Sequence, residues 1–109
     1  MTLSKSEYRT AKDVLKVGIL RKHEQWQQEL RELLDRPFDD EIGNAFDRSW
    51  MITKKSRDWF KELNRMEEWY KKDFIALYVR AMYQDGTLTD DDIAPLSDET
   101  KNIIKNGRW

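Results

Sequence analysis

Apolar residues recur at intervals of three and four along the first third of the chain, which is the spacing of one face of an α-helix. Residues 5–35 contain no Pro and a single Gly, and Ser4 followed by Glu7 matches the capping box that begins many helices. We therefore expect a first helix over residues 5–35. Its core-facing stripe consists of Tyr8, Ala11, Leu15, Ile19, Trp26, Leu30 and Leu33. Gly18 costs about 1 kcal/mol relative to alanine inside a helix, so a kink or a break there stays open.

A second stripe with helical spacing follows a segment of turn-forming residues. Residues 36–46 include Pro37, Gly43 and three consecutive acids, which is the composition of a connection. The apolar spacing beyond it predicts one helix over residues 47–84. The stripe of this second helix consists of Ile52, Trp59, Leu63, Met66, Tyr70, Phe74, Leu77 and Ala81. Two long helices joined by a short connection predict an antiparallel hairpin.

The last quarter of the chain carries signals for short helices. An Asp-Gly pair at 85–86 supplies a glycine of the kind that ends helices. Thr89 and Asp92 form a variant of the capping box. Ser97 is placed to cap a last helix, which Gly107 terminates.

Together these patterns predict an all-α fold in a single helical domain over residues 1–109: a long antiparallel two-helix hairpin, then a turn and short helices over residues 87–106. The composition agrees, because 4 Gly and 2 Pro are few for a β-sandwich or barrel of 109 residues. Charge is balanced, with 20 Lys and Arg against 21 Asp and Glu, so the total charge indicates no particular partner. The absence of Cys and the single His exclude disulfides, thiolate sites and His-rich metal sites.

Two segments resemble metal-binding motifs only in part. His23 begins a pattern like that of the zinc-protease helix, but Gln27 stands where the second histidine is required. Residues 85–92 resemble the second half of a calcium loop, but Ala81 and Tyr83 occupy ligand positions. We interpret His23 as a partly buried, hydrogen-bonded histidine and residues 85–92 as a plain connection between helices. No catalytic residue, metal ligand or cofactor is predicted.

The end of the predicted second helix is apolar on nearly every side, and such a helix must be covered. Two kinds of cover are possible: the C-terminal part of the same chain, or a second molecule. Five Trp, four Phe and four Tyr exceed what the single seam of a hairpin buries, so we expect both covers, with a dimer forming a four-helix bundle. A monomer closed by its own C-terminal helices is the alternative. The predicted partner-binding residues are Trp69, Ile75, Val79, Met82, Tyr83 and Trp109.

Basic residues outnumber acidic ones on the predicted second helix, by eight to four over residues 48–72. Most of them fall on one side of the helix, opposite the apolar stripe, where a row of positive charges could bind phosphates. Asp58 and Glu68 lie beside this row and can pair with it, which favours an ordinary solvated face. The candidate nucleic-acid-binding residues are Lys54, Arg57, Lys61, Arg65 and Lys72.

The sequence gives no sign of a secretory signal or a membrane span. Residues 1–5 lead directly into a charged segment, and Arg80 interrupts the least charged stretch, residues 74–84. We therefore predict a small, cytoplasmic, non-enzymatic protein of a bacterium or virus that acts through protein–protein interaction, first of all self-association. The expected partner is a second copy in a homodimer or another protein. A nucleic-acid-binding accessory protein is the alternative, and no membrane partner is expected.

Overall fold

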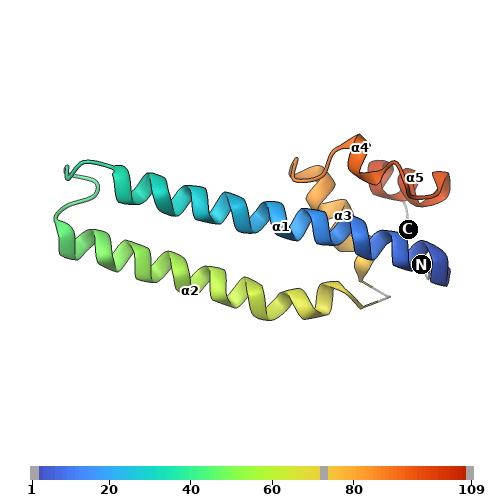
Figure 1. The fold of residues 1–109 in the computed structure, drawn as a ribbon, viewed down its shortest axis with the longest axis horizontal. Coiled ribbons are helices and arrows are strands. Elements are labelled where there is room, and N and C mark those ends of the chain that lie inside the picture. Colours follow the sequence, from blue (N-terminus) through green and yellow to red (C-terminus); the bar gives the residue numbers. More distant parts are fainter. Residues whose placement is uncertain (1–2, 72–73, 108–109) are drawn as a thin grey trace. The chain divides into compact units, whose positions relative to one another are not determined.

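The computed structural model describes residues 3–71 and 74–107, and the regular structure in this part of the chain is entirely α-helical (Figure 1). The helices are α1 (Lys5–Asp35), α2 (Ala45–Trp69), α3 (Ile75–Gln84), α4 (Asp90–Ile93) and α5 (Asp98–Asn106). The predicted all-α class, the two long N-terminal helices and the short C-terminal helices are confirmed.

The chain divides into two compact units, and α1 contributes to both. The first unit comprises Met1–Lys22 together with Glu67–Trp109, and the second comprises His23–Met66. The expectation of one domain over the whole chain stays a prediction. The two units are described separately below.

The first unit has a continuous apolar core, formed by the first half of α1 together with α3, α4 and α5. Helices α3 and α5 pack against each other. The buried apolar side chains come from α1, α3, α4, α5 and the segments next to these helices: Leu3, Ala11, Val14, Leu15, Ile19, Ile75, Ala76, Val79, Met82, Leu88, Ile93, Leu96, Ile103 and Ile104. Burial of this many aliphatic side chains is the main source of stability for a unit of this size.

Helix α1 runs without interruption through Gly18, so the break left open by the sequence does not occur. Its N-terminus is capped by Ser4, whose Oγ accepts a hydrogen bond from the Glu7 backbone N–H at 3.1 Å. The Glu7 carboxylate does not complete a capping box; it accepts a hydrogen bond from the Ser97 backbone N–H at 2.8 Å. Glu7 therefore ties the start of α1 to the N-terminus of α5.

The predicted single helix over residues 47–84 is wrong in one respect, because the chain forms two helices there. Helix α2 ends at Trp69 and α3 begins at Ile75. The apolar stripe over residues 52–70 and the set that contains Ile75 and Val79 lie roughly 150° apart around a continuous helix, at 3.6 residues per turn. An uninterrupted helix would bury one set and expose the other. The break changes the rotation of the chain and lets Ile75 and Val79 enter the core of the first unit.

The expected caps of the C-terminal helices are confirmed. Thr89 and Asp92 form a complete capping box at the N-terminus of α4. Ser97 caps α5 by accepting a hydrogen bond from the Thr100 backbone N–H at 3.2 Å. Gly107 ends α5 with a left-handed backbone, φ +68°, which glycine adopts without a Cβ penalty.

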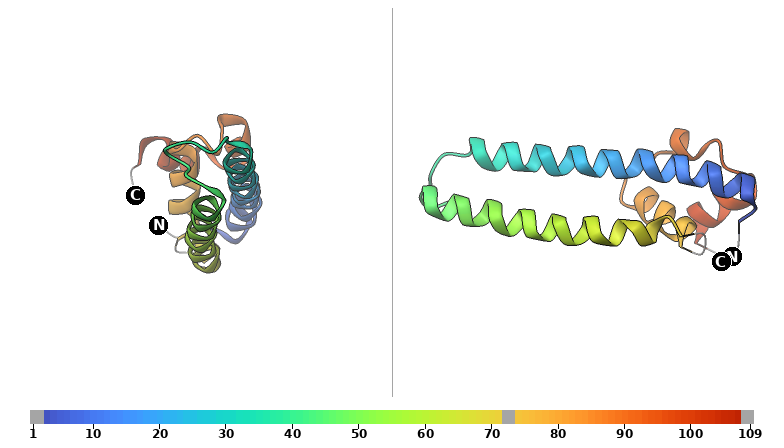
Figure 2. Two further views of the ribbon diagram at one scale, coloured as in Figure 1. Left: turned by 90° about the vertical axis from the view of Figure 1, so that its left-hand side faces the viewer. Right: turned by 60° about the horizontal axis from the view of Figure 1, so that its bottom comes forward.

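The second unit is an antiparallel hairpin of the second half of α1 and α2, joined by the connection over residues 36–44 (Figure 2). Asn44 and Asp47 cap α2 reciprocally, each side chain accepting the other's backbone N–H at 3.0 and 2.9 Å. In the seam the rings of Trp26 and Trp59 stack with their centroids 5.7 Å apart. The ring of His23 meets Trp59 edge-on, at 5.1 Å between centroids. The interior of this unit therefore combines half-buried aromatic rings with aliphatic side chains, of which Leu33 and Ile42 are buried.

Candidate functional site

Helix α2 carries apolar side chains on two faces, and only one of them packs against α1. The inward face contributes Ile52, Trp59 and Leu63, which are half-buried as the predicted stripe requires. The outward face carries three strongly exposed aromatic residues: Phe46 is 78% exposed, Phe60 63% and Trp50 56%. Exposed apolar surface of this kind marks interaction sites more often than isolated surface leucines do.

These aromatic residues belong to one continuous line on α2. The positions 46, 50, 53, 57 and 60 are separated alternately by four and three residues, which keeps them on one side of a helix. We call this line the outer stripe. It consists of Phe46, Trp50, Thr53, Arg57 and Phe60.

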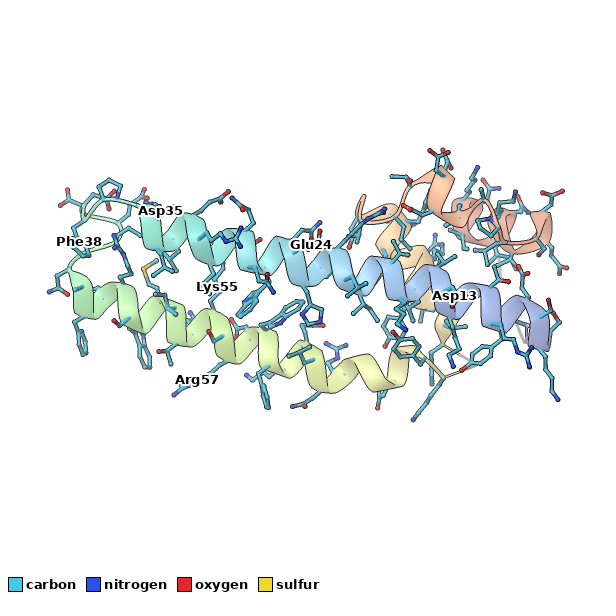
Figure 3. All side chains as sticks on the ribbon, viewed as in Figure 1. Asp13, Glu24, Asp35, Phe38, Lys55 and Arg57 are labelled. Carbon is cyan, nitrogen blue, oxygen red and sulfur yellow. The ribbon has the colours of Figure 1, made fainter. Side chains whose placement is uncertain are left out.

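Two residues in the middle of the outer stripe, Trp50 and Arg57, contact each other. The guanidinium carbon of Arg57 lies 5.6 Å from the centre of the Trp50 ring, which is within the range of a cation–π contact. Arg57 points away from α1, whereas Lys55 points toward α1 and pairs with Glu29 at 3.3 Å (Figure 3). A shallow groove runs beside the stripe. It is lined by Ile52, Thr53, Ser56, Arg57, Phe60 and Lys61.

The predicted basic row shares Arg57 with the outer stripe and otherwise runs along one edge of it. Its described members, Lys54, Arg57, Lys61 and Arg65, are all exposed, as expected for residues opposite the seam. The guanidinium of Arg65 pairs with Glu62 at 3.5 Å. The remaining member, Lys72, lies outside the described residues. The face therefore combines exposed aromatic rings with a flank of positive charge.

Sequence analysis missed the outer stripe as an apolar feature. It assigned one apolar stripe to α2 and placed the surplus of aromatic residues at the end of that helix. The usable signal was that Phe46, Trp50 and Phe60 fall on a line of positions with alternating four-and-three spacing. Thr53 and Arg57 occupy the intermediate positions and made the line look polar.

The residues predicted to bind a partner occupy other environments. Ile75, Val79 and Met82 lie in the core of the first unit, almost fully buried, which corrects their assignment to a docking surface. The chain's own C-terminal segment covers them, which is the first of the two covers considered. Tyr83 is half-buried, and its hydroxyl donates a hydrogen bond to Asp90 at 2.9 Å, which raises the pKa of the tyrosine. The side chain of Trp69 and the whole of Trp109 lie outside the described part of the structure.

Three residues assigned to the inward stripe are instead exposed on α3 or just before it. Phe74 and Leu77 are each 45% exposed, and Ala81 is exposed as well. The reversal follows from the break between α2 and α3, because the buried side of α3 is the side that contains Ile75 and Val79. Phe74 and Leu77 form a smaller apolar surface than the outer stripe.

The acidic residues at 85–92 are engaged by basic side chains of the same unit. Asp92 forms a bidentate pair with the Arg21 guanidinium, and it also accepts the Thr89 backbone N–H at 2.7 Å. These bonds, the one from Arg21 first, hold the pKa of Asp92 well below its usual range. Asp90 pairs with Lys105 at 3.1 Å. These carboxylates stabilise the fold of the first unit.

The Asp85 carboxylate is likewise held by hydrogen bonds within the first unit. Burial alone would raise the pKa of its carboxyl, but hydrogen bonds from Thr87 and Lys22 outweigh burial and lower it. The Lys22 ammonium lies 2.9 Å from Asp85 Oδ2. Within the ranges 3–71 and 74–107, His, Asp and Glu form no group of three or more that could hold a metal ion.

Comparison of the chain with protein-family models, with curated proteins and with solved structures finds no match. Among the described residues, no helix is both long enough and apolar enough to cross a bilayer. The argument about function therefore depends on the surface of this chain.

Proposed function

We propose that the protein acts by protein–protein interaction, in the first place with a second copy of itself, through the outer stripe of α2. The observation that carries the proposal is the exposure of Phe46, Trp50 and Phe60 on one side of a helix whose other side is already packed. Removing such rings from water is favourable, and Trp and Arg are the residues that most often dominate binding energies at interfaces. The spacing of four and three residues fits contact with another helix.

A non-enzymatic role is consistent with how the reactive side chains are used. The His23 ring packs edge-on against Trp59. Asp85 and Asp92 hold Lys22 and Arg21 of their own unit. These contacts are structural, and a binding function requires none of them to change.

A second candidate function uses the same face. Lys54, Lys61 and Arg65 stand beside exposed aromatic rings, and this combination suits single-stranded nucleic acid, whose bases stack on aromatic side chains while basic residues follow the phosphates. Such binding weakens steeply as salt rises, because each neutralised phosphate releases counterions.

Light scattering on a size-exclusion column, at about 50 and 500 mM salt and up to roughly 100 μM protein, tests both functions. Self-association predicts a molar mass near twice 13.2 kDa at both salt concentrations. A variant with Trp50→Ser and Phe60→Ser should be monomeric with an unchanged far-UV circular dichroism spectrum. The matched control, Phe74→Ser with Leu77→Ser, removes the exposed apolar side chains next to or on α3 and should remain dimeric.

A mass near 13.2 kDa at every concentration would overturn the self-association proposal. Titration of the same samples with a labelled single strand then decides the second candidate. Binding at low salt that disappears at high salt, and that is lost in the Trp50→Ser and Phe60→Ser variant, would assign the face to nucleic acid.

A further inference from the structure

The outer stripe has the pattern of a two-stranded helical seam. Its alternating spacing assigns Trp50 and Arg57 to one set of seam positions and Phe46, Thr53 and Phe60 to the other, as in a heptad repeat. Building on the proposed function, we infer that the occupant of this stripe is α2 of a second copy running antiparallel. In this pairing Trp50 of each copy packs against Phe60 of the other.

The charge on the stripe selects the antiparallel orientation. In a parallel pair each seam residue meets its own equivalent, so Arg57 would face Arg57 inside the interface, where like charges are costly. An antiparallel pair brings residues of the two sets together. Arg57 then lies beside Thr53 of the second copy, whose hydroxyl tolerates a charged neighbour.

The aromatic residues select one register among the antiparallel pairings. When Trp50 faces Phe60, Thr53 faces Arg57 and Phe46 faces Asn64. A shift of one heptad in one direction places Phe60 opposite residue 43, before the start of α2 at Ala45. The opposite shift places Phe46 opposite residue 71, beyond the end of α2 at Trp69. Only the intermediate register keeps all the aromatic residues between the two helices.

The edges of the stripe agree with this register. A two-fold axis perpendicular to both helices places like edges together, so Asp47 of each copy lies near Lys61 of the other. Lys54 meets Lys54 on the same edge, which leaves two attractive pairs against one repulsive pair. On the other edge Ser56 meets Ser56. These small side chains allow the helices to approach closely.

The area of the stripe is adequate for a specific dimer. Phe46, Trp50 and Phe60 together expose about 400 Å² per copy, if a fully exposed aromatic side chain presents roughly 200 Å². The rings alone would remove about 800 Å² from water, and the flanking lysine methylenes and serines bring the total toward the ~1,200 Å² at which stable interfaces begin.

The chain has no cysteine, so single-cysteine variants report the register without background. In the inferred dimer the two residues at position 56 are separated by only about 3 Å along the helix axis, but those at position 49 by about 18 Å. Ser56→Cys should therefore be converted to a covalent dimer by a short bis-maleimide. Ser49→Cys is the matched control, because it changes a serine on the same edge that is more exposed than Ser56.

The expected result is covalent dimer from Ser56→Cys at several times the yield from Ser49→Cys, with both variants dimeric by light scattering before the reagent is added. Dimeric protein that gives equal yields from the two variants, or more from Ser49→Cys, overturns the antiparallel register and leaves the proposed function standing. Monomeric protein that gives no covalent dimer overturns both. Cross-linking is performed on the folded 109-residue chain, and circular dichroism verifies the fold of each variant.

Discussion

Gly18 on α1 lies directly against Met82 on α3, and a Cβ added at Gly18 would overlap Met82 Sδ. Met82 is itself buried in the core of the first unit. The glycine therefore weakens the intrinsic preference of α1 for helix but allows α1 and α3 to pack. This contact explains why a helix of 31 residues accepts a glycine in its interior.

Gly18→Ala is expected to destabilise the protein by about 1–2 kcal/mol, because overpacking of the core outweighs the roughly 1 kcal/mol that alanine gains in helix propensity. Urea unfolding followed by circular dichroism measures the change. Met82→Ala makes room for the added methyl group, so the double variant should be more stable than the sum of the single effects predicts. If the two effects are additive, the contact with Met82 is not the reason that alanine at position 18 destabilises the protein.

The pair between Arg21 and Asp92 makes stability depend on pH in the acid range. Because the pKa of Asp92 lies below its ordinary value of 3.8 in the folded protein, the pair contributes fully at neutral pH and is lost as the pH falls below that value. Asp92→Asn should cost about 1–2 kcal/mol at pH 7, a figure that allows for the partial exposure of Arg21. The difference from the unaltered protein should shrink by pH 3. Asp91→Asn, an exposed neighbour, serves as the control and should change stability little at either pH.

Truncation of Trp59 should lower the stability of the fold, whereas truncation of the adjacent Phe60 should weaken self-association. Trp59 stacks on Trp26 in the seam of the hairpin, so Trp59→Ala should lower the free energy of unfolding by about 2–3 kcal/mol. Phe60 lies on the outer stripe, so Phe60→Ala should change the stability of the dilute monomer by less than about 0.5 kcal/mol. The same variant should weaken self-association at least ten-fold in sedimentation experiments. Strong destabilisation of the monomer by Phe60→Ala would contradict the assignment of this residue to an interface.

The sequence was sufficient for features that depend on local chemistry. The bounds of α1, the caps at Ser97 and Gly107, and the capping box of Thr89 with Asp92 all follow from side chains within one turn of the site concerned. Such signals act between residues three or four positions apart, so no knowledge of the packing is required.

The break between α2 and α3 could not be read from residues 70–74, which contain neither Pro nor Gly. Its cause is a tertiary requirement, since Ile75 must enter the core formed with the first half of α1 and the C-terminal helices rather than continue the stripe of α2. The outer stripe was missed for a related reason. A helix with apolar residues on two faces gives no local indication of which face its own chain covers, and Phe60 and Trp59 are adjacent in the sequence.

Substitutions at Lys54 and Lys61 distinguish self-association from nucleic-acid binding. In the inferred dimer Lys54 faces Lys54, so Lys54→Gln removes a repulsion and should strengthen the dimer about two- to five-fold, equivalent to roughly 0.5–1 kcal/mol. Lys61→Gln removes two attractions to Asp47 and should weaken the dimer by a similar or larger factor. For a nucleic-acid interface both substitutions remove a phosphate contact, so both should weaken binding and each should reduce the salt dependence by about one charge. Sedimentation equilibrium and titration with a labelled single strand measure the two affinities, and opposite effects of the two variants on the dimer are the outcome that the antiparallel pairing requires.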